Sequence, residues 1–179
     1  MESQHQLRDA FERKVDILGR RSSAGVGTSV TRVTVTAGLQ CAITSGKWTF
    51  KSDMGIADGG LGNAPTPGDY LRCALGTDLA TSYMLWSSRM EIQIDALSVS
   101  VEADYDKRGA FGIGDASPEY IRLRYRVTVQ SPHSQTDLLD MMDVAEQHCP
   151  NLQLLRNAPK IDRIVRIDAA PAGQSEEKQ

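Results

Sequence analysis

The chain has 179 residues, of which 40% are hydrophobic and 24% charged, and its formal net charge is -3. These values are typical of one globular domain with its own core, and the interspersed charges form no basic patch for nucleic acid. No apolar stretch reaches the about 20 residues of a spanning helix, and the polar start resembles no signal peptide. We therefore expect a cytoplasmic protein with neither nucleic-acid nor membrane partners.

The cysteines and histidines argue against cofactor and metal sites. Three cysteines are an odd number, and none of them stands in a C-x-x-C pair, which excludes a disulfide framework and a structural zinc site. The three histidines lack metal-ligand spacing. The glycine-rich stretch 55–62 matches neither a phosphate-binding loop nor a dinucleotide fingerprint. We expect no metal and no cofactor.

The N-terminal part is predicted to be a helix followed by a linker. Apolar residues over residues 4–20 recur every three or four positions, at Leu7, Phe11, Val15 and Leu18. Residues 20–27 have linker composition. We predict an N-terminal helix and linker over residues 1–27, with a docking role, a compact domain over 28–169, and a disordered tail over 170–179.

Three antiparallel strands and a central helix follow. Apolar residues alternate between Thr31 and Phe50, with two glycine turns. Thr66 and Pro67 mark a helix start after the glycine-rich loop. The helix runs to about Ser88 and is apolar nearly all round, which is typical of a helix in the centre of a molecule or in a subunit interface.

Beyond this helix the pattern predicts two long strands, over 97–101 and 121–129, joined by a loop over 107–118. A helix over 135–147 ends before Pro150, and a short turn or helix leads to a last strand. That strand is predicted from three apolar residues, Ile161, Ile164 and Ile167.

Asp78 is the most informative single residue. Helical phase places it in the middle of the apolar stripe of the central helix, where a carboxylate must be paired, hydrogen-bonded or protonated. It is either a structural aspartate or an acid that lines a cavity. Arg72 points to another side of the helix, so any partner must come from another element or another subunit.

The three thiols have different surroundings. Cys149 follows His148 near a helix C-terminus, where the dipole raises a thiol pKa. It is either a small buried side chain or a thiolate paired with His148. Cys41 lies on the core face of its strand, and Cys73 lies on the back of the central helix relative to Asp78.

Several phrases resemble the OsmC/Ohr family of osmotically induced and organic hydroperoxide resistance proteins. Residues 52–53 and 59–71 are similar to the family's entry to its central helix, residues 72–78 to "L-A-A-L-A-A-C", and residues 145–150 to its second cysteine region. The resemblance covers about residues 30–168. It implies an α+β fold in which antiparallel sheets wrap around buried central helices in an intertwined homodimer.

The resemblance also implies a chemistry. In the family, a peroxidatic cysteine on the central helix attacks a hydroperoxide, and a second cysteine resolves the sulfenic acid. Asp78 stands at the peroxidatic position and Cys149 at the resolving position. A carboxylate cannot form a sulfenic acid. Two activating family residues correspond to Gly68, beside Asp69, and to the region of Leu39. The residues expected to line the cavity are Leu39, Cys41, Gly68 and Asp69.

Three hypotheses follow. The leading one is a homodimer without the family's peroxidase activity that keeps an interface cavity, lined by Asp78, for a small hydrophobic ligand. The second is a residual thiol peroxidase that reduces a hydroperoxide with Cys149 or Cys41 as the nucleophile and His148 as the base. The third is a structural or partner-binding dimer that docks through its N-terminal helix.

Overall fold

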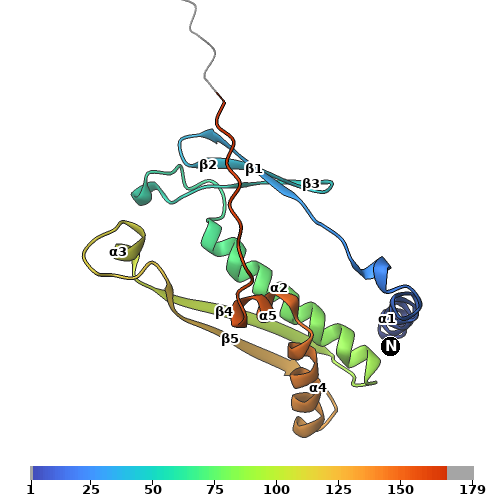
Figure 1. Cartoon of the computed structure of the whole chain (residues 1–179). Coiled ribbons are helices and arrows are strands. Elements are labelled where there is room, and N and C mark those ends of the chain that lie inside the picture. Colours follow the sequence, from blue (N-terminus) through green and yellow to red (C-terminus); the bar gives the residue numbers. More distant parts are fainter. Residues whose placement is uncertain (1, 169–179) are drawn as a thin grey trace, which may run out of the picture.

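Helix α2 (Pro67–Arg89) runs through the middle of the computed structural model, which describes residues 2–168 (Figure 1). Its first turn is closed by a capping box. The Thr66 hydroxyl accepts the Asp69 N–H at 3.2 Å, and the Asp69 carboxylate accepts the Thr66 N–H at 2.8 Å. Pro67 occupies the first helical position, where its missing N–H costs nothing. The predicted helix start is confirmed.

The strands form two separate antiparallel sheets. One has the order β1-β2-β3 and the other pairs β4 with β5 along their length. The predicted groups of three and two strands are therefore confirmed. The loop predicted over residues 107–118 begins with a short helix, α3 (Lys107–Ala110). The strands are β1 (Thr31–Ala37), β2 (Gln40–Ser45), β3 (Trp48–Ser52), β4 (Ala96–Tyr105) and β5 (Tyr120–Gln130).

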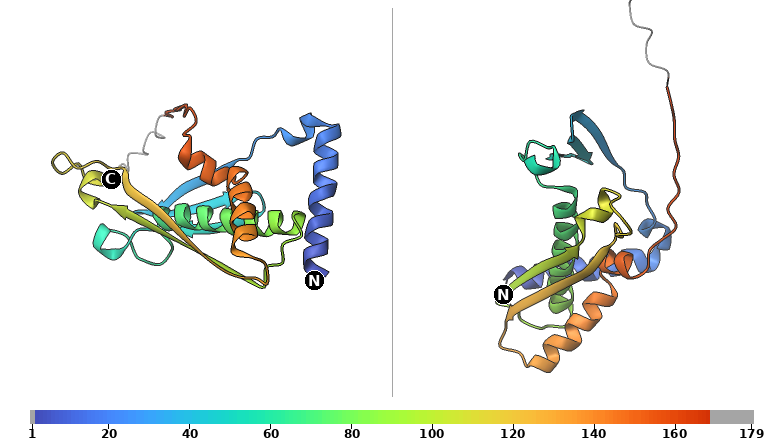
Figure 2. Two further views of the ribbon diagram at one scale, coloured as in Figure 1. Left: turned by 90° about the horizontal axis from the view of Figure 1, so that it is seen from below. Right: turned by 90° about the vertical axis from the view of Figure 1, so that its left-hand side faces the viewer.

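The core lies between α2, the β4–β5 hairpin, α4 (Gln135–Gln147) and α5 (Pro150–Arg156) (Figures 1 and 2). Helix α4 starts at Ser134, whose hydroxyl accepts the Asp137 N–H. One side of α2 is buried here, while Cys73, Thr77 and Thr81 on its other side are exposed in the single chain. The buried cluster consists of Leu75, Leu79, Tyr83, Ile92, Met141, Ala145, Cys149 and Leu152.

Helix α1 (Glu2–Arg20) packs across the C-terminal half of α2, and a short 3-10 helix, η1 (Ser22–Gly25), follows it (Figure 2). The Phe11 ring meets the Trp86 ring edge to face at 5.5 Å. The Arg89 guanidinium lies over both rings, at 5.0 and 5.2 Å from their centres. The amphipathic helix thus half-buries Leu7 and Phe11, while Val15 stays 41% exposed.

The glycine-rich loop before α2 carries a second 3-10 helix, η2 (Ile56–Asp58). Asp53 is almost fully buried, and its carboxylate accepts the N–H groups of Met54 and Leu61. At Gly60, a Cβ would collide with the Met54 carbonyl oxygen. This close backbone approach explains why glycine stands there.

The last predicted strand is wrong. Residues 157–168 have no regular secondary structure, and Ile161, Ile164 and Ile167 are 87%, 96% and 90% exposed. Apolar spacing alone does not make a strand, because a neighbouring strand must supply the hydrogen bonds. The predicted disordered tail, residues 170–179, lies outside the described residues. Among residues 2–168, no helix is both long and apolar enough to cross a bilayer.

Candidate functional site

Asp78 joins the middle of α2 to the junction between α4 and α5. One carboxylate oxygen, Oδ2, accepts the Cys149 thiol at 3.2 Å and the Asn151 backbone N–H at 2.7 Å. The Asn151 side chain in turn donates to the Ala74 carbonyl on α2 at 3.3 Å. The expectation that Asp78 is paired with another element is therefore confirmed. The structure thus brings together the two residues that the resemblance placed at the reacting positions.

The carboxylate acts as an N-terminal cap that comes from another helix. Cys149 is the residue before the first turn of α5, and Pro150 begins that helix, but the Cys149 side chain makes no capping bond. The open N–H groups of a first turn favour an anionic acceptor. Asp78 supplies one to Asn151. Helical phase predicted the pairing of Asp78. Pro150 was used only to predict the end of the preceding helix, but a proline at the first position is also a local signal for the start of α5.

The Cys149 thiol is held in its protonated form. Its side chain is fully buried. Burial, first of all, and then the bond to the Asp78 carboxylate raise the pKa of the Cys149 thiol above its ordinary value. The His148 ring stacks on Trp86, with ring centres 4.7 Å apart. In this arrangement the thiol donates a hydrogen bond to the Asp78 carboxylate, and His148 packs on an aromatic ring.

A polar cluster that the sequence analysis missed lies beside Cys149. The Tyr83 hydroxyl donates to Glu146 at 2.9 Å, and Arg156 pairs with Glu146 at 3.2 Å. Burial, followed by the bond to Glu146, raises the pKa of Tyr83 far above its usual range, and burial raises that of Tyr125 to about 12. These tyrosines stay neutral at physiological pH. Their grouping depends on long-range packing and has no local sequence signal.

The four residues predicted to line a cavity with Asp78 lie elsewhere. Cys41 is half-buried in β2, and Leu39 is in the turn before it. Asp69 belongs to the capping box and pairs with Arg72. A Cβ at Gly68 would lie 3.3 Å from the Tyr120 hydroxyl. In the single chain none of these four residues contributes to the cavities described here.

A cavity of about 400 Å³ lies between α2 and β4. It occupies the side of α2 that carries Cys73, opposite Asp78, so Asp78 does not line it. Its walls are mainly apolar, with Arg72 as the one charged residue among them. The lining residues are Arg72, Cys73, Gly76, Thr77, Ala80, Val99 and Val101. Within residues 2–168, no group of three histidine, cysteine, aspartate or glutamate side chains could hold a metal ion.

The protection of Cys149 can be measured. In a variant in which Cys41→Ser and Cys73→Ser leave Cys149 as the only thiol, a chromogenic disulfide reagent at pH 7.5 is expected to release almost no product from the folded protein. Complete burial and the raised pKa both suppress the thiolate. One equivalent should appear in urea. Prompt release of one equivalent from the folded protein would contradict this description and indicate a reactive thiol.

Comparisons with known proteins identify the family and the fold. The OsmC-like protein family matches residues 60–163 in sequence. No curated protein matches the chain. Among solved structures, the OsmC-like protein of Mycoplasma pneumoniae has a TM-score of 0.63 and 14% identity, over 74% of this chain and 89% of that one.

Two further solved structures share the fold. The organic hydroperoxide resistance protein of Elizabethkingia anophelis has a TM-score of 0.59 and 14% identity, over 74% of this chain and 91% of that one. The organic hydroperoxide resistance protein OsmC of Legionella pneumophila has a TM-score of 0.56 and 13% identity, over the same shares. The matched segment covers more than half of the chain, from the glycine-rich loop to beyond α5, so the protein belongs to the OsmC/Ohr family.

Proposed function

We propose that this protein is an OsmC-family member that does not carry out the family's thiol peroxidase chemistry. The observation that carries the proposal is Asp78, whose carboxylate accepts the Cys149 thiol and caps α5. A carboxylate at the position of the attacking sulfur cannot be oxidised to a sulfenic acid. Asp78 and Cys149 therefore form a hydrogen-bonded pair that does not pass through the family's cycle of thiol oxidation and reduction.

The residual-peroxidase hypothesis has less support. Its nucleophile would be Cys149, which is fully buried and has a raised pKa, or Cys41, which lies in the β1–β3 sheet. Its base would be His148, whose ring stacks on Trp86. A reactive thiol needs an accessible thiolate, and the surroundings of Cys149 favour the neutral thiol.

The test is stopped-flow reduction of cumene hydroperoxide with dihydrolipoate as the dithiol donor. The protein is expected to reduce the peroxide no faster than its Cys149→Ser variant, which removes the resolving thiol at small structural cost. Rapid turnover by the unchanged protein that disappears in Cys149→Ser would overturn the proposal. Rapid turnover that disappears in a Cys41→Ser variant would overturn it equally.

A homodimer is the second part of the proposal, and the β1–β3 sheet supports it. Val33, Ile43 and Phe50 stand opposite each other and form an apolar row across the sheet, and Val35 and Cys41 form the next. The other face carries mainly polar residues. An antiparallel sheet with this alternation normally packs its apolar face against another surface and leaves its polar face in solvent. Yet Val33 and Val35 are 58% and 66% exposed in the single chain, although Ile43 in the same row is buried and the Phe50 ring lies 5.6 Å from the Tyr70 ring of α2.

We propose that a second copy of the chain packs against the apolar face of the β1–β3 sheet. The exposed isoleucines of residues 157–168 point to the same conclusion, because a segment of this kind is stabilised only by a partner surface. Light scattering is expected to give twice the chain mass of 19.6 kDa. Val33→Glu on the apolar face should shift the protein to monomer, while Thr34→Glu on the polar face should not. A monomeric parent would contradict the dimer.

We further propose that the cavity between α2 and β4 takes a small hydrophobic ligand. Its about 400 Å³ falls in the range of small-molecule sites, and its walls are mainly apolar. Arg72, the one charged residue of the lining, would bind a polar head group of the ligand. Ala80→Leu, which fills the cavity, is expected to weaken binding of dodecanoic acid, whereas Thr81→Leu on the exposed side should not. Equal binding by both variants would contradict this cavity as the site, and no binding by the unchanged protein would favour the purely structural dimer.

Cytoplasmic residence is also part of the proposal. All three cysteines are free thiols, the state that the reducing cytosol maintains. A fluorescent fusion separated by cell fractionation would test it.

A further inference from the structure

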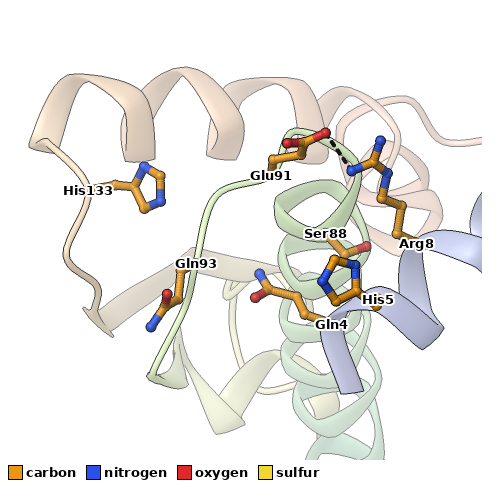
Figure 3. Close-up of a pocket in the computed structure, with 7 residues that line it drawn as sticks. All are labelled: Gln4, His5, Arg8, Ser88, Glu91, Gln93 and His133. Carbon is orange, nitrogen blue, oxygen red and sulfur yellow. Dashed lines mark hydrogen bonds and ion pairs between the residues drawn. The ribbon is translucent and has the colours of Figure 1, made fainter. Parts of the chain in front are cut away.

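A second cavity, of about 200 Å³, lies between α1, the turn that follows α2 and the residues before α4 (Figure 3). We propose that it binds a small oxyanion, such as phosphate or the carboxylate of a small acid. Helix α1 lies outside the segment that matches the OsmC-like family. The residues around it are Gln4, His5, Arg8, Ser88, Glu91, Gln93 and His133.

The α1 side of the cavity is fixed by two polar contacts one helical turn apart. The Gln4 side chain donates to the Ile92 carbonyl at 2.7 Å, and Arg8 pairs with Glu91. His5 lies next to Gln4 on the same turn and faces the cavity (Figure 3). The helix therefore presents an imidazole and a guanidinium together from one rigid element.

The opposite wall of the cavity is held in place by hydrogen bonds of Ser131. Ser131 donates its hydroxyl proton to the Gln93 carbonyl and accepts the His133 backbone N–H at 3.1 Å. These bonds hold the strand-to-helix connection against the turn that follows α2. The His133 ring projects from that connection into the space shared with Gln93 and Gln4 (Figure 3). Imidazoles from two distant parts of the chain thus line one cavity.

The side chains of this cavity suit an anion. Within residues 2–168, no side chain makes a hydrogen bond to the ring of His5 or of His133. Imidazole and guanidinium groups offer N–H donors, and those on cationic groups bind oxyanions most strongly. The carboxamides of Gln4 and Gln93 already donate one hydrogen bond each, to the Ile92 carbonyl and to Asp95. A metal cation is a poor alternative, because no metal-binding cluster exists among the described residues and Arg8 adds positive charge.

Glu91 is the internal competitor for the anion. It has a φ of 59°, in the left-handed region, where the Ile92 N–H closes the end of α2 on the Ser87 carbonyl at 2.8 Å. Glycine is the usual residue at this position. Glutamate here places its carboxylate on Arg8, so part of the guanidinium already has an oxyanion partner. A bound anion would accept hydrogen bonds from the Arg8 N–H groups that Glu91 does not use, or it would displace the Glu91 carboxylate from Arg8.

The volume limits the ligand to a small one. Pockets for drug-sized molecules measure about 300–1,000 Å³, and this cavity is smaller. Inorganic phosphate and acetate are suitable probes, because they present the same oxyanion chemistry in tetrahedral and planar form. A response to either supports the site, and the stronger response identifies the preferred geometry.

The first test uses the three histidines of the chain. During a titration with phosphate or acetate at constant ionic strength, the imidazole NMR signals of His5 and His133 are expected to move together and saturate at one concentration. His148, which stacks on Trp86 away from the cavity, is the internal control. No movement with either anion, or equal movement of all three signals, would overturn the proposal.

The second test separates anion binding from the ion pair itself. Arg8→Gln and Glu91→Gln both break the Arg8–Glu91 pair, but the first removes an anion donor and the second removes the competitor. Arg8→Gln should weaken binding by about tenfold or more, and Glu91→Gln should strengthen it. Arg13→Gln, on α1 but outside the cavity, is the control. Equal shifts in one direction for both variants would contradict the site, and Trp86 fluorescence checks that α1 stays docked.

Discussion

An Asp78→Cys variant is expected to reduce cumene hydroperoxide at a rate that the unchanged protein does not approach. The substitution places a thiol on α2 where the Asp78 carboxylate now contacts the Cys149 sulfur at 3.2 Å. It also removes the carboxylate whose bond and charge help to raise the pKa of Cys149. Two thiols then meet at the junction of α2, α4 and α5.

The expected reaction is a two-electron reduction of the hydroperoxide by the two thiols. The new thiolate attacks the hydroperoxide, the O–O bond breaks, an alcohol leaves and a sulfenic acid remains. The Cys149 sulfur displaces water from the sulfenic acid and forms a disulfide. Dihydrolipoate reduces that disulfide and is itself oxidised. One turnover therefore consumes one hydroperoxide and one dithiol.

Two controls make this result specific. The Asp78→Ser variant removes the carboxylate without adding sulfur and should stay inactive. Asp78→Cys combined with Cys149→Ser should form the sulfenic acid but no disulfide, which mass spectrometry detects. If Asp78→Cys is folded and dimeric but forms neither species with peroxide, position 78 does not correspond to the reactive position of the family.

The second large effect is on stability. Asp78→Ala is expected to lower the free energy of unfolding by about 2 kcal/mol, because the Asn151 N–H loses its cap and the buried Cys149 thiol loses its acceptor. Asp78→Asn keeps one acceptor oxygen and should lose about half as much. Urea unfolding followed by circular dichroism measures both.

An exposed aspartate on α4 provides the comparison. Asp143→Ala should change the stability by no more than about 0.5 kcal/mol. If Asp78→Ala is as stable as the parent, the cap contributes nothing and the buried pair has some other role. If Asp143→Ala lowers the free energy of unfolding as much as Asp78→Ala does, the loss is a general effect of substitutions in these helices and does not come from the Asp78 cap.

Local signals predicted the elements, and long-range packing decided the site. Thr66, Pro67 and Asp69 define the start of α2 within four residues, and alternation defines β1 to β3. The phase of Asp78 on its helix was enough to predict a partner. The identity of that partner was not predictable, because the Asn151 N–H is a backbone group with no sequence signature.

One prediction was wrong and another stays a prediction, and both depend on packing that local sequence does not encode. Residues 157–168 carry regularly spaced isoleucines, but their own sequence does not supply the neighbouring strand that would pair with them. Leu39 and Gly68 were placed in a cavity by correspondence with the family, and the single chain places them beside the sheet and Tyr120 instead. Both predictions needed a surface that lies far away along the chain.

The separation of the two sheets has a consequence for how this protein assembles. The β4–β5 hairpin folds against helices of its own chain, in a first-order process that dilution does not slow. The β1–β3 sheet contacts its own chain at Phe50 and Ser52 but leaves Val33 and Val35 exposed. In the proposed homodimer, the final ordering of this sheet would therefore depend on encounters between chains and would become slower as the protein is diluted. Newly made chains at low abundance would thus carry a finished helical core and an unfinished sheet whose exposed edges can pair with unrelated strands.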